Sequence, residues 1–154
     1  MSTPYASATT GTKAREEIIK VLRRFGCESI GFMDDFATHE VLLAFTHRGR
    51  KVQLHASAKG WAQMFLKEKP WSYSRRSTRV DYEQQALKQG HVAVNSILRD
   101  WIKGQMTAVE CGIVSFEAVF MPWMLTADGR PLAERVAELL PKPDEPKVVA
   151  LPAR

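Results

Sequence analysis

The sequence lacks the features on which several classes of protein depend. Its 154 residues include only two cysteines, Cys27 and Cys111, which are too far apart for a Cys-x-x-Cys site and too few for a disulfide scaffold. No apolar run approaches the roughly 18 residues that a membrane-spanning helix needs, and the first residues lack a secretory signal pattern. We therefore expect a cytoplasmic protein without a membrane partner, in which both thiols are reduced, buried and inert.

Motifs for the common cofactor and hydrolase sites are also absent. The chain contains no Walker A loop, no G-x-G-x-x-G, no H-E-x-x-H and no G-x-S-x-G. These absences exclude the motif-based nucleotide-binding, zinc-protease and hydrolase classes. We predict no cofactor, no metal site and no catalytic residue, so the protein is more consistent with binding than with catalysis.

One enzymatic alternative stays open, a metal-dependent nuclease. In that hypothesis the carboxylates of Asp34, Asp35 and Glu40 hold a divalent cation, with Lys51 nearby against phosphate. Adjacent aspartates at the end of a strand favour a turn instead, because their side chains accept hydrogen bonds from nearby backbone N–H groups. The turn is therefore our prediction for this pair.

The residues that are present suit one domain with a single core, since 45% are hydrophobic and 25% are charged. Helical spacing predicts an amphipathic helix from near Thr12 to Gly26 and a long helix from Asp81 to about Cys111. Between them, short segments rich in β-branched and aromatic residues predict antiparallel strands over Glu28–Met33, Glu40–Thr46 and Arg50–Ala56. We further expect a weak helix over Ala58–Lys67, a loop over Pro70–Arg79, and short helices beginning at Ser115 and Pro131.

These elements predict an α+β fold with an N-terminal helix, a three-stranded antiparallel sheet, a long crossing helix and short C-terminal helices. Residues 1–12 are expected to form a mobile arm because they offer nothing to bury, residues 13–140 a single α+β domain, and residues 141–154 a proline-rich tail. Gly90 and Gly104 lie on or beside the apolar stripe of the long helix, which predicts that another backbone approaches closely at both.

Positive charge is concentrated in one part of the chain. Residues 47–79 contain nine Lys and Arg residues against Glu68 alone, a net charge of +8; because the whole chain carries +5, the remainder carries −3. Clustered cations attract polyanions, and each contact with a phosphate releases counterions. We therefore predict one continuous cationic strip that binds nucleic acid. Its phosphate-binding candidates are Arg48, Arg50, Lys51, Arg75, Arg76 and Arg79.

Two aromatic residues, Trp71 and Tyr73, stand immediately before Arg75 and Arg76. Aromatic faces among guanidinium groups are typical of sites for single-stranded nucleic acid, because every base can stack on a ring. The alternative is that aromatic rings cap the open side of the sheet, which their helical spacing favours for Trp61 and Phe65. For Trp71 and Tyr73 the sequence leaves both interpretations open.

A longer pattern stands at the end of the long helix. It resembles a family of small, mostly uncharacterised proteins encoded by bacteriophages and prophage-like regions, which share an Ala-Val-Glu-x-Gly-Ile-x-x-Phe-Glu helix end and a later Asp-Gly-Arg turn. The matching residues are Ala108, Val109, Glu110, Gly112, Ile113, Phe116, Glu117, Asp128, Gly129 and Arg130. The resemblance covers most of Lys13–Leu140 and departs from the family in Ser57–Lys69. The resemblance implies that the protein originates from a mobile element and is located in the bacterial cytoplasm. It identifies no catalytic residues.

The sequence supports two main functional hypotheses. The first is a non-enzymatic, phage-associated protein of recombination or DNA processing that binds nucleic acid, with single-stranded DNA favoured. The predicted strands and crossing helix are loosely similar to the β-β-β-α core of phage single-strand annealing proteins, at the level of fold alone. The alternative is a protein interaction module, such as an inhibitor of a host defence or nucleic-acid-processing protein. An exposed sheet edge also permits a homo-oligomer.

Overall fold

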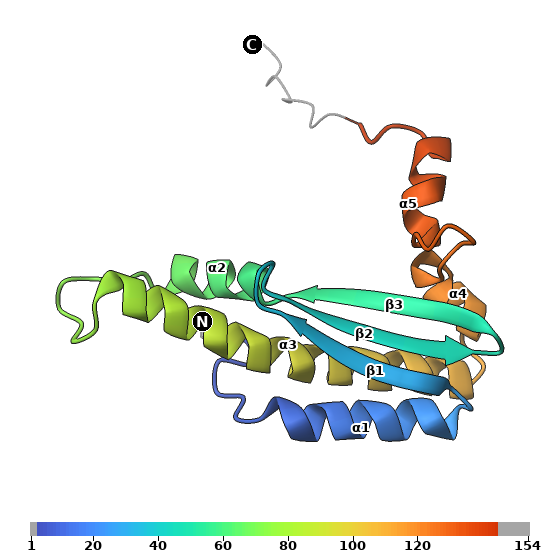
Figure 1. The fold of residues 1–154 in the computed structure, drawn as a ribbon, viewed down its shortest axis with the longest axis horizontal. Coiled ribbons are helices and arrows are strands. Elements are labelled where there is room, and N and C mark those ends of the chain that lie inside the picture. The colour runs from blue at the N-terminus through green and yellow to red at the C-terminus, as the bar shows by residue number, and fades with distance from the viewer. Residues whose placement is uncertain (1–2, 145–154) are drawn as a thin grey trace, which may run out of the picture.

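The structure is a computed structural model that describes residues 3–144. It has the predicted α+β fold, in which helices lie along one side of a three-stranded antiparallel sheet (Figure 1). The elements in chain order are α1 (Gly11–Arg24), β1 (Glu28–Asp35), β2 (Glu40–His47), β3 (Arg50–Ser57), α2 (Ala58–Glu68), α3 (Arg79–Glu110), α4 (Phe116–Phe120), η1 (Met121–Trp123), α5 (Leu132–Val136) and η2 (Ala137–Leu139). The predicted tail over residues 141–154 lies, from residue 145 onward, outside the described residues.

Helix α1 forms as its apolar spacing predicts, one residue earlier than expected. Ala14, Ile18 and Leu22 are fully buried on one face of the helix. Gly26 follows the last turn with a φ of +78°, a left-handed conformation that glycine adopts without steric cost. The local sequence therefore fixes both the buried face of α1 and the turn that leads into β1.

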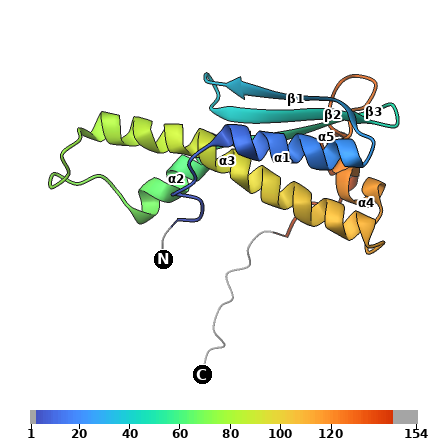
Figure 2. The same cartoon turned by 90° about the horizontal axis from the view of Figure 1, so that it is seen from below.

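The sheet has the strand order β1-β2-β3, and alternation of side chains gives it two different faces. In β3, Val52 and Leu54 are buried, whereas Lys51 and His55 point to the exposed face. Helices α1 and α3 lie side by side along the buried face (Figures 1 and 2). The opposite face of the sheet is left without a covering helix among the described residues, as expected for an antiparallel sheet with one wet face.

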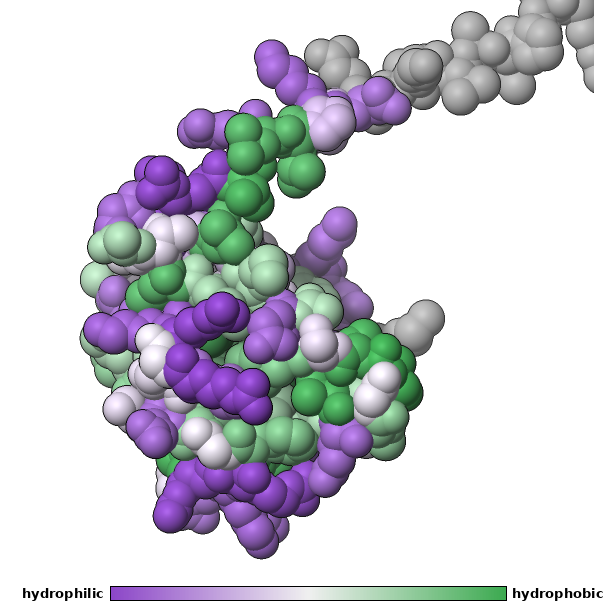
Figure 3. Space-filling view, turned by 90° about the vertical axis from the view of Figure 1, so that its right-hand side faces the viewer, coloured by the Kyte–Doolittle hydropathy of each residue, from purple (hydrophilic) through white to green (hydrophobic). Residues whose placement is uncertain are grey.

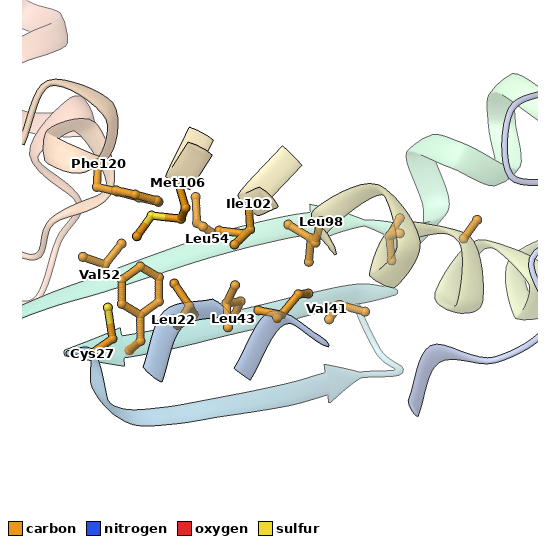
Figure 4. Packing of buried hydrophobic residues seen from close by; sticks show 14 of the residues in the cluster. Leu22, Cys27, Val41, Leu43, Val52, Leu54, Leu98, Ile102, Met106 and Phe120 are labelled. Atoms are coloured by element: carbon orange, nitrogen blue, oxygen red, sulfur yellow. The ribbon is translucent and has the colours of Figure 1, made fainter. Parts of the chain in front are cut away.

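The core lies between the sheet and these two helices. Figure 4 shows Leu22 of α1, Leu43 of β2 and Ile102 of α3 converging there, and all three are fully buried. Phe120 of α4 closes the end of the core against Phe45 of β2, with ring centroids 5.6 Å apart and planes at 89°. Edge-to-face packing of this kind adds about 0.5–1.5 kcal/mol beyond burial, so the short α4 anchors the C-terminal part of the chain.

Helix α3 crosses the whole sheet and is the longest element, with 32 residues. The Thr78 hydroxyl caps its start by accepting a hydrogen bond from the Asp81 N–H at 3.2 Å. The close approach predicted at Gly90 is confirmed, because a Cβ there would lie 2.5 Å from the Ala58 carbonyl oxygen of α2. The same prediction for Gly104 is wrong, since a Cβ there would meet nothing within 4 Å. Within residues 3–144, neither α3 nor any shorter helix is apolar enough to cross a membrane.

Residues 3–10 make buried contacts that the sequence analysis did not predict. Thr3 is only 3% exposed and donates to Glu68 of α2 at 2.7 Å. The Trp61 indole N–H donates to the Pro4 carbonyl at 3.0 Å, and the Gln89 amide donates to the Ala8 carbonyl at 2.8 Å. The reason lies in tertiary structure, since α2 and α3 present donors to the backbone carbonyls of this segment and α2 presents an acceptor to the Thr3 hydroxyl.

Candidate nucleic-acid interface

The segment that joins α2 to the first residue of α3, residues 69–79, projects from one end of the long axis of the molecule (Figure 1). We call it the basic aromatic loop. Tyr73 is 95% exposed, whereas Trp71 is half-buried. The sequence left open whether Trp71 and Tyr73 are buried or available to a ligand. The structure gives a different answer for each ring, because Trp71 packs into the loop and Tyr73 is exposed to solvent.

One hydrogen bond and one aromatic contact inside the loop hold these two rings in place. The Trp71 indole N–H donates to the Ser77 carbonyl at 2.8 Å, which closes the loop on itself. The Tyr73 ring meets the Trp71 ring edge to face, with centroids 4.8 Å apart and planes at 66°. The half-buried indole therefore supports the exposed phenol, which can present an open face to a ligand.

The loop's cations have different neighbours. The Arg75 guanidinium lies 4.5 Å from the centroid of the Tyr82 ring, a cation–π contact that keeps its charge at the surface. Arg79 pairs with Glu83 at 3.1 Å, one turn along α3. Among the described residues, Lys69, Arg75 and Arg76 have no carboxylate within ion-pair distance. Three cations of the loop thus have no carboxylate partner among the described residues and remain available to an external anion.

Three other predicted cations, Arg48 in the β2–β3 turn and Arg50 and Lys51 at the start of β3, lie at the opposite end of the molecule (Figure 1). Strand β3 leaves this turn and α2 continues in the same direction, so eight strand residues and eleven helical residues separate the turn from the loop. At 3.3 and 1.5 Å per residue this is about 40 Å. Of the nine cations in the predicted strip, those near the turn and those of the loop thus lie at opposite ends of the molecule, while Lys59 and Lys67 lie exposed on α2 between them.

The surface around the β2–β3 turn has mixed charge. Figure 3 faces this end and shows hydrophilic side chains at the centre and lower edge, with apolar ones between them. Arg48 and Arg50 share a small cavity of about 170 Å³ with Glu117, and Arg24 pairs with Glu110 at 3.3 Å. Interleaved carboxylates weaken the attraction of this end for a polyanion, which makes the loop the stronger candidate of the two.

The carboxylates of the nuclease alternative are engaged separately. Asp35 accepts hydrogen bonds from the N–H groups of Thr38 and Ala37 at 3.1 and 2.9 Å, and these bonds hold the pKa of Asp35 below its ordinary value. The predicted hydrogen bonds to the backbone of a turn are thus confirmed for Asp35, although both aspartates lie in β1, just before the turn. Asp34 instead pairs with Arg15 at 2.6 Å.

The rest of the nuclease arrangement is not assembled either. Glu40 lies 3.4 Å from His55. Lys51 pairs in the sheet with Thr46, six residues along β2 from Glu40, which corresponds to about 20 Å. In residues 3–144 no three His, Cys, Asp or Glu side chains gather as metal ligands would. The structure therefore does not bring the proposed cation ligands together with Lys51.

A cavity that the sequence analysis missed lies between the β1–β2 turn and α3. It has a volume of about 620 Å³ and is lined by Phe36 and His39 of the turn and by α3 residues that include Gln84, Gln85, Lys88 and His91. His39 Nδ1 lies 3.4 Å from His91 Nε2. Burial lowers the pKa of His91, although the carboxylate of Asp34 acts in the opposite direction from 4.0 Å. The one feature of the sequence that could have indicated this cavity is Phe36, a large apolar residue in the β1–β2 turn.

The two cysteines differ in their surroundings. Cys27 is 5% exposed, as predicted, and burial raises the pKa of its thiol to about 11. Cys111 is exposed, which contradicts the prediction that it is buried. It stands one residue beyond α3, where the helix has passed the core and Gly112 turns the chain with a φ of +74°.

Comparisons of this chain with protein-family models, with curated proteins and with solved structures found no match.

Proposed function

We propose that the protein binds single-stranded nucleic acid through the basic aromatic loop and performs no catalysis. The observation that carries the proposal is the position of the Tyr73 ring, 95% exposed, on a loop where Arg75 and Arg76 have no ion-pair partner among the described residues. A large exposed ring has no role in the core, whereas it offers a stacking surface for a base.

The cations of the loop and its exposed ring contribute to binding in different ways. Lys69, Arg75 and Arg76 attract phosphates and release counterions, which is independent of sequence. Tyr73 stacks on a base, and a base is accessible for stacking only where the strand is unpaired. The combination favours a single strand over a duplex. Because the β2–β3 turn is about 40 Å away, Arg48, Arg50 and Lys51 are not part of this binding surface.

The resemblance to phage and prophage proteins adds a context to the proposal. In that context the protein acts in the bacterial cytoplasm during recombination or DNA processing, with single-stranded DNA as its partner. A non-catalytic role agrees with the separate engagement of Asp34, Asp35 and Glu40.

Fluorescence anisotropy with a labelled oligo-dT of about 15 nucleotides tests the proposal directly. The double variant Arg75→Ala/Arg76→Ala and the single variant Tyr73→Ala should each bind at least about fivefold more weakly than the wild type. All three side chains are exposed, so the fold should be unchanged.

Two control variants separate the loop from general charge. Lys20→Ala/Arg23→Ala removes the same charge from an exposed face of α1, and Arg50→Ala/Lys51→Ala removes it from the β2–β3 turn. Both should retain wild-type affinity within about twofold. Equal losses in all three double variants would mean that net charge, and not the loop, determines binding, and would overturn the proposal.

One observation favours a second candidate function, an interaction module for a protein partner. Strand β1 pairs only with β2 among the described residues, so its other edge is open, and Met33 on that strand is 59% exposed. Open edges can accept a strand from a partner. A pull-down from nuclease-treated bacterial lysate distinguishes the candidates, since a protein partner would survive the nuclease and a nucleic-acid-bridged one would be lost.

A further inference from the structure

We propose that the cavity between the β1–β2 turn and α3 binds one nucleobase of the strand that the basic aromatic loop holds. This inference rests on the proposed function and extends it from a general cationic surface to a defined site for a base. The cavity, at about 620 Å³, falls within the usual range for small-ligand sites.

The wall of the cavity offers stacking surfaces for a planar ring. Phe36 is 70% exposed, and its ring centroid lies 5.1 Å from that of His91, with planes at 40°. His39 meets His91 edge to face, with centroids 5.7 Å apart. Phe and His side chains are among those on which unstacked bases pack. An exposed phenylalanine held against a histidine is costly to leave in water, and a base would cover it.

The polar groups of the cavity suit a base better than a group of phosphates. The amides of Gln84 and Gln85 each carry both donors and an acceptor, which matches the edge of a base. The lining contains one lysine, Lys88, and one carboxylate, that of Asp81. A site with balanced charge gives little attraction to a polyphosphate, but one lysine can meet the single phosphate attached to a bound nucleotide.

The cavity is continuous with the basic aromatic loop through Ser77. This residue lines the cavity, and its carbonyl accepts the hydrogen bond from the Trp71 indole. Trp71, which supports the Tyr73 ring, and the lining of the cavity therefore meet at Ser77. A strand with one base on Tyr73 can pass Ser77 and place a following base between Phe36 and the glutamines.

Affinity measurements on variants of the cavity test this proposal. Phe36→Ala removes the stacking ring, and Gln85→Ala removes one amide. Met33→Ala is the matched control, because it deletes another exposed apolar side chain close by in the sequence but outside the lining of the cavity. Phe36→Ala should weaken binding of the labelled oligo-dT at least about fivefold, with unchanged salt dependence because no charge is lost, whereas Met33→Ala should bind as the wild type does.

A second measurement uses thymidine monophosphate as the probe, followed by ¹H–¹⁵N NMR spectra. Shifts confined to residues such as Phe36, Gln85 and His91 would support a base site and would mean that a free nucleotide also enters it. If the wild type and Phe36→Ala bind oligo-dT equally well, the cavity proposal is overturned while the loop proposal stands. If no oligonucleotide binds, the loop proposal fails, and the spectra decide the cavity: shifts at its lining support it as a nucleotide site, and unchanged spectra overturn it.

Discussion

Nδ1 of His39 lies 3.4 Å from Nε2 of His91, although 52 positions separate the two residues in the chain. At neutral pH one ring nitrogen can donate to the other, whereas two protonated rings would face each other with donors only. The nearby charges are Asp34, 4.0 Å from His91, and Arg15, which pairs with Asp34. The contact joins the β1–β2 turn to α3, so its protonation bears on the stability of that junction.

From the contact between His39 and His91 we predict that the free energy of unfolding falls in mild acid. Burial lowers the pKa of His91 below the ordinary 6.5, so the unfolded chain binds a proton more readily than the folded one. The contribution of His91 to the free energy of unfolding is therefore present above pH 6.5 and is lost as the pH falls through the lowered pKa. Urea unfolding at about pH 7.5 and about pH 5.5 measures the loss.

His91→Gln is the matched variant for this prediction, because it keeps a polar side chain without titrating. It should show a smaller loss of stability between the two pH values than the wild type. A residual loss is expected, since burial also lowers the pKa of His47. An identical pH dependence in the variant and the wild type would contradict the assignment to His91.

Replacing each of the two glycines of α3 by alanine should change the free energy of unfolding in opposite directions. At Gly90 a Cβ would lie 2.5 Å from the Ala58 carbonyl, and a backbone oxygen cannot rotate away as a side chain does. Gly90→Ala should therefore lower the free energy of unfolding by about 1–3 kcal/mol in spite of the better helix propensity. Gly104→Ala meets nothing within 4 Å and should raise it by about 0.5–1 kcal/mol. Chemical denaturation of both variants gives the comparison, and a loss at both positions would contradict it.

Features of the fold that depend on neighbours in the sequence could be predicted from it. The alternation of Val52 and Leu54 with Lys51 and His55 gave the two faces of β3, and Gly26 marked the end of α1. Gly104 shows the limit: its place beside the apolar stripe resembles that of Gly90, and only the position of α2 distinguishes the two. Such contacts between distant segments leave no periodic signal in the chain.

The packing of residues 3–10 predicts resistance to proteolysis. Two carbonyls of this segment, those of Tyr5 and Ala8, accept hydrogen bonds from the Gln89 amide at 3.3 and 2.8 Å. Gln89→Ala should therefore raise the rate of chymotrypsin cleavage after Tyr5 by up to about thirtyfold, at about 1 kcal/mol for each of the two bonds lost. Gln63→Ala, on the exposed face of α2, is the control and should cleave like the wild type. Equally fast cleavage of all three chains would instead support the mobile arm expected from composition.

The two thiols should differ sharply in reactivity. Cys111 is exposed, whereas Cys27 is buried and burial raises the pKa of its thiol to about 11. Because the thiolate is the reactive form, Ellman's reagent should modify Cys111 rapidly in the native protein and Cys27 only after unfolding. Cys111→Ser should abolish the rapid phase. Two rapid equivalents in the native wild type would contradict the buried position of Cys27.

The candidate site could be predicted only in part. The composition of residues 69–79 indicated a cationic and aromatic loop, because those residues are neighbours in the chain. The separation of Arg50 from Arg75 was not predictable, since it depends on the direction in which α2 continues from β3. The cavity was missed for the same reason: Phe36 and His91 carry no shared pattern in the sequence and meet only when α3 crosses the sheet.

The salt dependence of oligo-dT binding tests the central claim most directly. Because Arg79 pairs with Glu83, Lys69, Arg75 and Arg76 provide about three phosphate contacts, so the logarithm of the association constant should fall with the logarithm of salt concentration with a slope of about −2. In Arg75→Ala/Arg76→Ala the slope should become shallower by about 1.4, because each contact with a single strand contributes about 0.7. A slope near zero in the wild type, or one unchanged in the double variant, would contradict binding through the loop.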